Sequence, residues 1–89
     1  MNNAELLEYY RKDIIQCLIK YGGFEEKEAQ QRIDESGLIP NLDDEVALSN
    51  FFHEEPYYWA MYLIQDDPGW YHNPKLWPPP KDYYEMKID

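Results

Sequence analysis

Residues 56–65 read PYYWAMYLIQ, and nine of these ten residues are apolar or aromatic. Pro56 suits the first turn of a helix, because the N–H that proline lacks would have no partner there. A helix that is apolar around its whole circumference is normally buried by other elements. We therefore expect a helix over residues 56–65 and expect it to be the central, most buried element of the fold.

Two helices are expected at the N-terminal end of the chain. Apolar side chains recur at spacings of three and four over residues 4–21, which places them on one helix face. Gly22-Gly23 then ends this helix, because glycine readily adopts the left-handed conformation of a helix C-terminus. A shorter helix is expected over residues 24–36, with acids in its first turn and Gly37 after its last residue.

A third helix can be capped by Asn41 or Asp43 and run through about Phe52, ahead of the helix at residues 56–65. A chain of 89 residues is long enough for one domain and too short for two. The predicted fold class is all-α, a compact bundle of about four short helices. Residues 1–68 form its helical part.

The C-terminal segment, residues 69–89, has a different composition. It follows the turn signal Asp66-Asp67-Pro68-Gly69 and contains four prolines, two tryptophans and three tyrosines. Proline disfavours helix, whereas the aromatic content is too high for a disordered tail. We expect an extended strap that packs across the helices within a single domain of residues 1–89, with Trp70 and Trp77 as its anchors.

The charge of the chain is concentrated in an acidic window, residues 33–74, which contains no lysine or arginine. This window holds nine of the eighteen carboxylates and carries a formal charge of −9 out of a total of −10. Such a block attracts basic partners and repels nucleic acid and anionic lipid. We therefore expect a basic protein partner, no direct nucleic-acid binding and no membrane binding.

Two explanations compete for these acids. Several of them can cap helices or only solvate the surface, which requires no function. Capping does not explain Asp34-Glu35, which lie near a helix C-terminus, where a base would be favoured. The other explanation is a surface that meets a basic partner, because arginine binds carboxylate and phosphate with the same planar fork.

The dense cluster at residues 51–59 also has two interpretations. Its rings can anchor a partner beside charged groups, or they can form a core junction between two helices. The residues expected to bind the partner are four acidic pairs and two tyrosines: Asp34, Glu35, Asp43, Asp44, Glu54, Glu55, Asp66, Asp67, Tyr57 and Tyr58.

Catalytic and metal-binding patterns are weak. His53 and His72 are nineteen residues apart, with no second histidine one helical turn from either. Cys17 is the only cysteine and faces the apolar stripe of the first helix, so a buried, inert thiol is expected. No glycine-rich phosphate loop or nucleophile elbow is present. We expect no enzyme, no cofactor and no metal, in a soluble, cytoplasmic protein.

The predicted function is a small acidic, non-enzymatic binding protein that docks onto a basic protein and inhibits it, in some cases by mimicking nucleic acid. In bulk properties the chain resembles small acidic inhibitors and immunity-type proteins of bacteria and phages, although no motif carries the comparison. The alternative is a structural or assembly protein, whose exposed aromatics and proline-rich segment make homo-oligomer or subunit contacts. Only the first interface should weaken steeply with salt.

Overall fold

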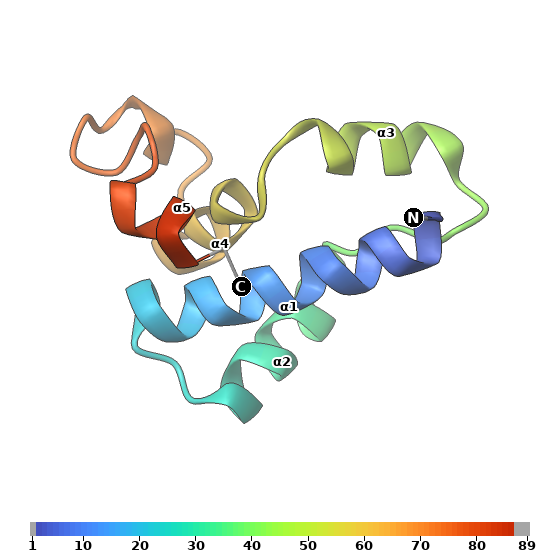
Figure 1. Cartoon of the computed structure of the whole chain (residues 1–89), viewed down its shortest axis with the longest axis horizontal. Coiled ribbons are helices and arrows are strands. Elements are labelled where there is room, and N and C mark those ends of the chain that lie inside the picture. Colours follow the sequence, from blue (N-terminus) through green and yellow to red (C-terminus); the bar gives the residue numbers. More distant parts are fainter. Residues whose placement is uncertain (1, 87–89) are drawn as a thin grey trace.

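The computed structural model describes residues 2–86, and all regular elements in that range are helical (Figure 1). The all-α prediction is confirmed. The expected number of about four short helices is wrong, because the described residues form five α-helices and one 3-10 turn. These elements are α1 (Asn3–Gly22), α2 (Glu26–Ser36), α3 (Glu45–His53), α4 (Pro56–Gln65), η1 (Trp70–His72) and α5 (Lys81–Met86).

Helix α1 is the longest element, with 20 residues, and both of its ends are closed by local bonds. The side chain of Asn2 caps the start by accepting a hydrogen bond of 2.8 Å from the backbone N–H of Glu5. Gly23 ends the helix in the left-handed region, with a φ of 70°, and its N–H donates to the carbonyl of Ile19. The predicted bounds of this helix are confirmed within one residue.

Helix α2 ends at Ser36 as predicted but begins at Glu26, two residues later than expected. Glu25 and Glu28 form a capping box at its start, and Gly37 closes its end with a φ of 68°. Ala29 and Ile33 form its buried face. Arg32 of α2 donates from Nη2 to the carbonyl of Leu63 at 3.2 Å, which ties α2 to the last turn of α4.

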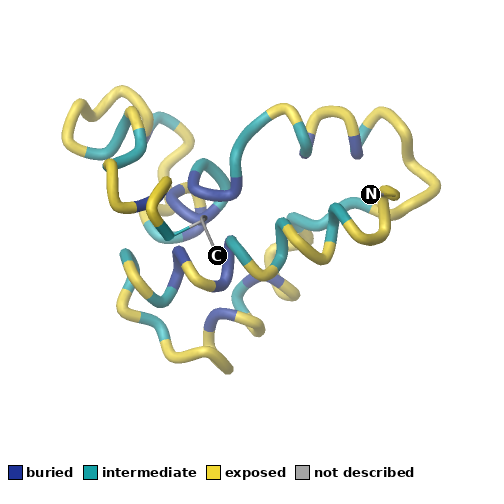
Figure 2. Tube along the Cα trace, viewed as in Figure 1, coloured by how far each residue is buried: buried dark blue, intermediate teal, exposed yellow. Residues whose placement is uncertain are grey.

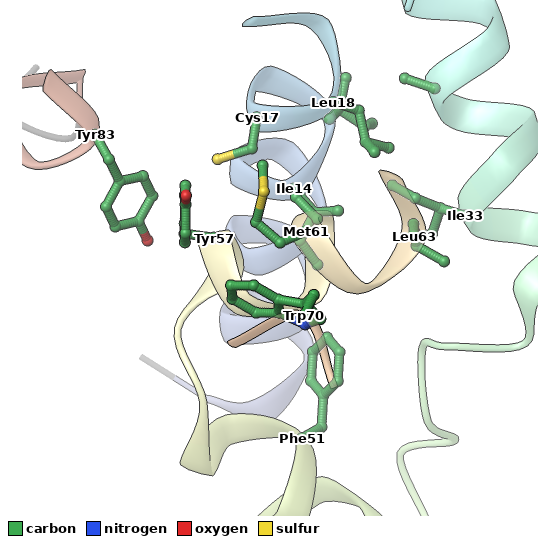
Figure 3. Packing of buried hydrophobic residues seen from close by; sticks show 13 residues of the cluster. Ile14, Cys17, Leu18, Ile33, Phe51, Tyr57, Met61, Leu63, Trp70 and Tyr83 are labelled. Atoms are coloured by element: carbon green, nitrogen blue, oxygen red, sulfur yellow. The ribbon is translucent and has the colours of Figure 1, made fainter. Parts of the chain in front are cut away.

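Helix α4 packs against α1 at the centre of the molecule, as predicted (Figure 1). The core forms where these two helices meet, and Figure 3 shows Met61 of α4 beside Cys17 of α1. The expected burial of the Cys17 thiol is confirmed. Burial around the whole of α4 is not observed, because Tyr62 is 41% exposed on the side that no helix covers.

Helix α3 begins later than predicted. The cap is Asp44 rather than Asn41 or Asp43, because the Asp44 carboxylate accepts a bond of 3.0 Å from the N–H of Ala47. Most of α3 is exposed, and Figure 2 shows only short buried stretches along it. The ring of Tyr10 on α1 packs against the end of α3. Its centroid lies 5.3 Å from that of Phe51 and 5.2 Å from that of Phe52.

The C-terminal segment is only partly extended, contrary to the prediction. Trp70 begins the short turn η1, and the three prolines at residues 78–80 stop just before α5. Residues 81–86 contain no proline, so a helix is free to form there once docking against the core stabilises it. The predicted anchor Trp70 is 3% exposed, whereas Trp77 is half-buried. Residues 87–89 lie outside the described part of the chain.

Helix α5 is held against the C-terminal end of α1. The ring of Tyr83 is fully buried, and its centroid lies 5.3 Å from that of the Tyr57 ring. Figure 3 shows the two rings side by side. The Asp82 carboxylate accepts a hydrogen bond of 2.8 Å from the Tyr21 hydroxyl and pairs with Lys20 at 3.1 Å. Apolar burial therefore fixes α5, and polar contacts at the surface set its orientation.

Two neighbouring tyrosines test how firmly α5 is packed. Replacing Tyr83 by alanine should lower the free energy of unfolding by about 3–5 kcal/mol, because a large buried ring is removed. Tyr84, next in sequence and 45% exposed, is the matched control, and Tyr84→Ala should cost about 1 kcal/mol or less. Urea denaturation of both variants measures the difference. Equal losses would mean that α5 does not contribute a core residue.

Alkaline pH should destabilise the fold. Burial raises the pKa of Tyr57 and of Tyr83 above the ordinary value of 10.0. Their stabilising contribution is therefore full below pH 10.0, the unfolded pKa, and is lost as pH rises above it toward the folded pKa. Urea denaturation at about pH 8 and about pH 11 should show lower stability at the higher pH, and tyrosinate absorbance at about pH 11 should increase further when the protein unfolds. Equal stability at the two pH values, with no increase of tyrosinate absorbance on unfolding, would contradict this burial.

Candidate binding surface

The four predicted acidic pairs lie at helix ends rather than on one helix face. Asp34-Glu35 are in the last turn of α2, Asp43-Asp44 precede α3, and Glu54-Glu55 join α3 to α4. Asp66-Asp67 follow α4. Helices α3 and α4 have nine and ten residues, so successive pairs across them are separated by about 13–15 Å. The structure does not bring all four pairs to one place.

Three of these acids have local structural roles. Asp44 caps α3, as described above. Asp66 takes the left-handed conformation that ends α4, with a φ of 51°, which aspartate tolerates better than most residues. The carboxylate of Asp67 accepts a hydrogen bond of 2.9 Å from the N–H of Gly69 and closes the turn after α4.

Asp34 and Glu35 were the acids that capping could not explain. The Asp34 carboxylate pairs with the Arg11 guanidinium of α1 at 2.8 Å. This pair is partly exposed, so it contributes about 0–1 kcal/mol. Glu35 accepts a hydrogen bond of 2.8 Å from Gln31, one turn earlier on α2, and remains exposed. Within residues 2–86, Asp34 is the only acid of the window with an ion pair.

The two predicted tyrosines have different environments. Tyr57 is 2% exposed and its hydroxyl donates to the carbonyl of Leu76 at 2.7 Å, so its side chain cannot reach a partner in this fold. Tyr58 is half-buried, and its ring lies 6.3 Å from that of the exposed Tyr71. Burial and, secondly, the charge of Glu54 raise the pKa of Tyr58. Of the two tyrosines, only Tyr58 remains at the surface.

Glu55 is half-buried beside the C-terminal helix. Burial raises the pKa of Tyr84 on α5, and the neighbouring Glu55 carboxylate raises it further. Glu55 also raises the pKa of Tyr10, after the larger effect of burial. The Glu55 carboxylate therefore acts on the molecule's own tyrosines.

An open groove of about 500 Å³ lies between α3, α4 and the connector at residues 36–40, and it is called the α3/α4 groove below. No pattern in the sequence predicted it. The apolar connector Leu38-Ile39-Pro40 is the sequence feature that could have indicated the groove, because apolar loop residues usually pack against another element. Side chains that line the groove include Leu38, Pro40, Ala47, Phe51, Trp59 and Tyr62.

A smaller hollow of about 300 Å³ adjoins this groove and shares Gly37 with it. Its polar residues are Arg11 and Asp34, which are already paired with each other. The charged side chains here satisfy one another, so the hollow offers no free group for catalysis.

No known protein guides the assignment of function. Comparisons with protein-family models, with curated proteins and with solved structures gave no match. Within residues 2–86, no group of three or more histidine, cysteine and acidic side chains is placed to hold a metal ion. No helix in the same range is both long enough and apolar enough to cross a membrane. The surface chemistry of the chain is therefore the basis for the proposals below.

Two adjacent aspartates separate capping from solvation. Asp44→Ala should lower the free energy of unfolding by about 1 kcal/mol, because the cap of α3 is lost. Asp43→Ala removes the same charge from an exposed side chain without a cap, and should change stability by less than about 0.5 kcal/mol. Asp44→Asn should keep most of the stability, since asparagine caps equally well. Urea denaturation measures the free energy of unfolding of the three variants. Equal values for all three would contradict the capping role of Asp44.

Proposed function

We propose that this chain is a non-enzymatic binding protein that docks through its acidic surface onto a basic protein and inhibits it. The observation that carries the proposal is that eight of the nine carboxylates in residues 33–74 have no ion pair within the described residues. Folding brings Arg11 to one of them and leaves the charge of the others uncompensated.

Uncompensated carboxylates favour this function for two physical reasons. Their summed potential steers a basic partner toward the surface and raises the association rate. Each carboxylate can also accept the paired N–H groups of an arginine, as a phosphate does. A basic protein that binds nucleic acid would then lose access to it while this chain occupies the same surface.

A second candidate is an assembly role, favoured by two exposed aliphatic side chains. Val46 is 73% exposed and Leu42 is 53% exposed, and both belong to the region around the start of α3. Large aliphatic groups in water favour burial in an interface. The net charge of −10 opposes association between copies of this chain, which makes an apolar contact with a different subunit the better fit.

The salt dependence of association separates the two candidates. The immobilised protein is incubated with native extract at low ionic strength, and the captured protein is identified, purified and tested for its activity. The rate at which the captured protein associates with this chain should fall steeply as ionic strength rises. The activity of the captured protein should fall when the complex forms. An acidic or neutral partner with a salt-independent rate, or a stable homodimer in sedimentation, would contradict the proposal.

Amide substitutions then locate the charges that matter. Glu35→Gln, Asp43→Asn and Glu45→Gln together should slow association with the captured partner by about tenfold, because three charges are removed without a change of shape. Asp66→Asn with Asp67→Asn is a control at the far end of α4, where amides preserve the turn. Circular dichroism should show equal folding of both variants. Equal rates for both variants and the wild type would contradict a charged interface.

A further inference from the structure

We infer that the α3/α4 groove binds an amphipathic helix of the partner, with apolar side chains in the groove and lysine or arginine along its edges. This inference rests on the proposed function and names the binding site and the kind of partner segment.

The interior of the groove is built to receive apolar groups. Leu38 and Pro40 form one wall from the connector, Ala47 and Phe51 form another from α3, and Tyr62 contributes from α4. The volume of about 500 Å³ is within the range of sites that enclose ligand side chains. No lysine or arginine lines it.

The side of α3 next to the groove carries the most exposed aliphatic residue. Val46 is 73% exposed and lies one helical turn before Asn50, which lines the groove. Leu42, which is 53% exposed, precedes the same helix. The other strongly exposed large hydrophobic residues within residues 2–86 are tyrosines, whose hydroxyl groups can bond to water. Both exposed aliphatic side chains therefore lie close in sequence to groove-lining residues of α3, although neither lines the groove itself.

Carboxylates flank both ends of the groove along the chain. Glu35 directly precedes the lining residue Ser36, and residues 43–45 are three consecutive acids between the lining residues Pro40 and Ala47. The Asp44 carboxylate is placed at the edge by its bond of 3.0 Å to the N–H of Ala47. Arg11, which lines the adjoining hollow, is paired with Asp34.

This arrangement selects a basic helix over other occupants. The groove is bordered by α3, α4 and a short connector, and none of these described residues forms a strand, so an extended peptide has no sheet edge to join. A second copy of this chain would bring its own charge of −10 toward the same carboxylates. An amphipathic helix instead presents an apolar stripe at spacings of three and four, flanked by long basic side chains.

Two synthetic peptides of about 18 residues, a length of about 27 Å as helices, provide the probe. Both contain only leucine and lysine in equal proportion. One has leucine at helical spacing, and the other has the same composition in an order that forms no apolar stripe. Fluorescence anisotropy gives the affinities, and nuclear magnetic resonance of the labelled protein locates the binding. The amphipathic peptide should bind about tenfold more tightly, with shifts centred on Leu38, Ala47 and Tyr62.

Charge placed inside the groove gives the decisive comparison. Asn50→Lys puts a cation at an exposed, groove-lining position of α3 and should weaken binding of the amphipathic peptide by about tenfold. Gln16→Lys is the matched control, because Gln16 is exposed on α1 and lines neither hollow. Ala47→Lys, at another groove-lining position of α3, is a second groove variant if Asn50→Lys disturbs the fold.

The outcomes separate this inference from the proposed function. Equal binding of the two peptides, with shifts spread over all the acidic pairs, would overturn the groove as the site and leave a basic partner in place. Equal weakening by Asn50→Lys and Gln16→Lys would do the same. If neither peptide bound at all, both the groove as the site and the basic partner would be overturned. A homodimer that buries the groove in the protein alone would also overturn the inference.

Discussion

The burial of Tyr57 on α4 organises the rest of the structure. Its ring packs against three others, with centroid distances of 5.4 Å to Tyr21 of α1, 6.1 Å to Trp70 of η1 and 5.3 Å to Tyr83 of α5. Its hydroxyl donates to the carbonyl of Leu76 at 2.7 Å, so the polar end of a buried ring is satisfied. One side chain thus joins the central helix to α1 and to three points of the C-terminal segment, and α5 packs because this surface exists.

The same packing leaves one side of α4 open. Helix α1 and the C-terminal segment cover the faces of α4 near Tyr57, whereas Tyr62, five residues later, stays at the surface. Helix α3 is attached mainly by aromatic contacts, including the stacked rings of Phe51 and Trp59 at 5.4 Å. These contacts leave the α3/α4 groove open between α3, α4 and the connector. The groove is therefore a consequence of how the core is filled.

Capping and partner binding are compatible roles for one carboxylate. Asp44 holds the first turn of α3 and, from the same position, places negative charge at the edge of the groove. A capped helix start gives that charge a fixed location, which a flexible surface side chain lacks. Asp66 and Asp67 show the other outcome, since their turn lies after α4 and their charge has no apolar surface assigned beside it. Sequence position alone did not distinguish these two cases.

The sequence by itself determined the all-α fold, the bounds of α1 and α4, the end of α2, the buried thiol of Cys17 and the acidic window, because helical periodicity, glycine stops and charge are local properties. Tertiary structure decided what depends on distant contacts. Residues 81–86 became helical because Tyr83 found a buried site against Tyr57, and Tyr57 became a core residue for the same reason. The groove arose where a connector, α3 and α4 meet, an encounter that no local pattern encodes.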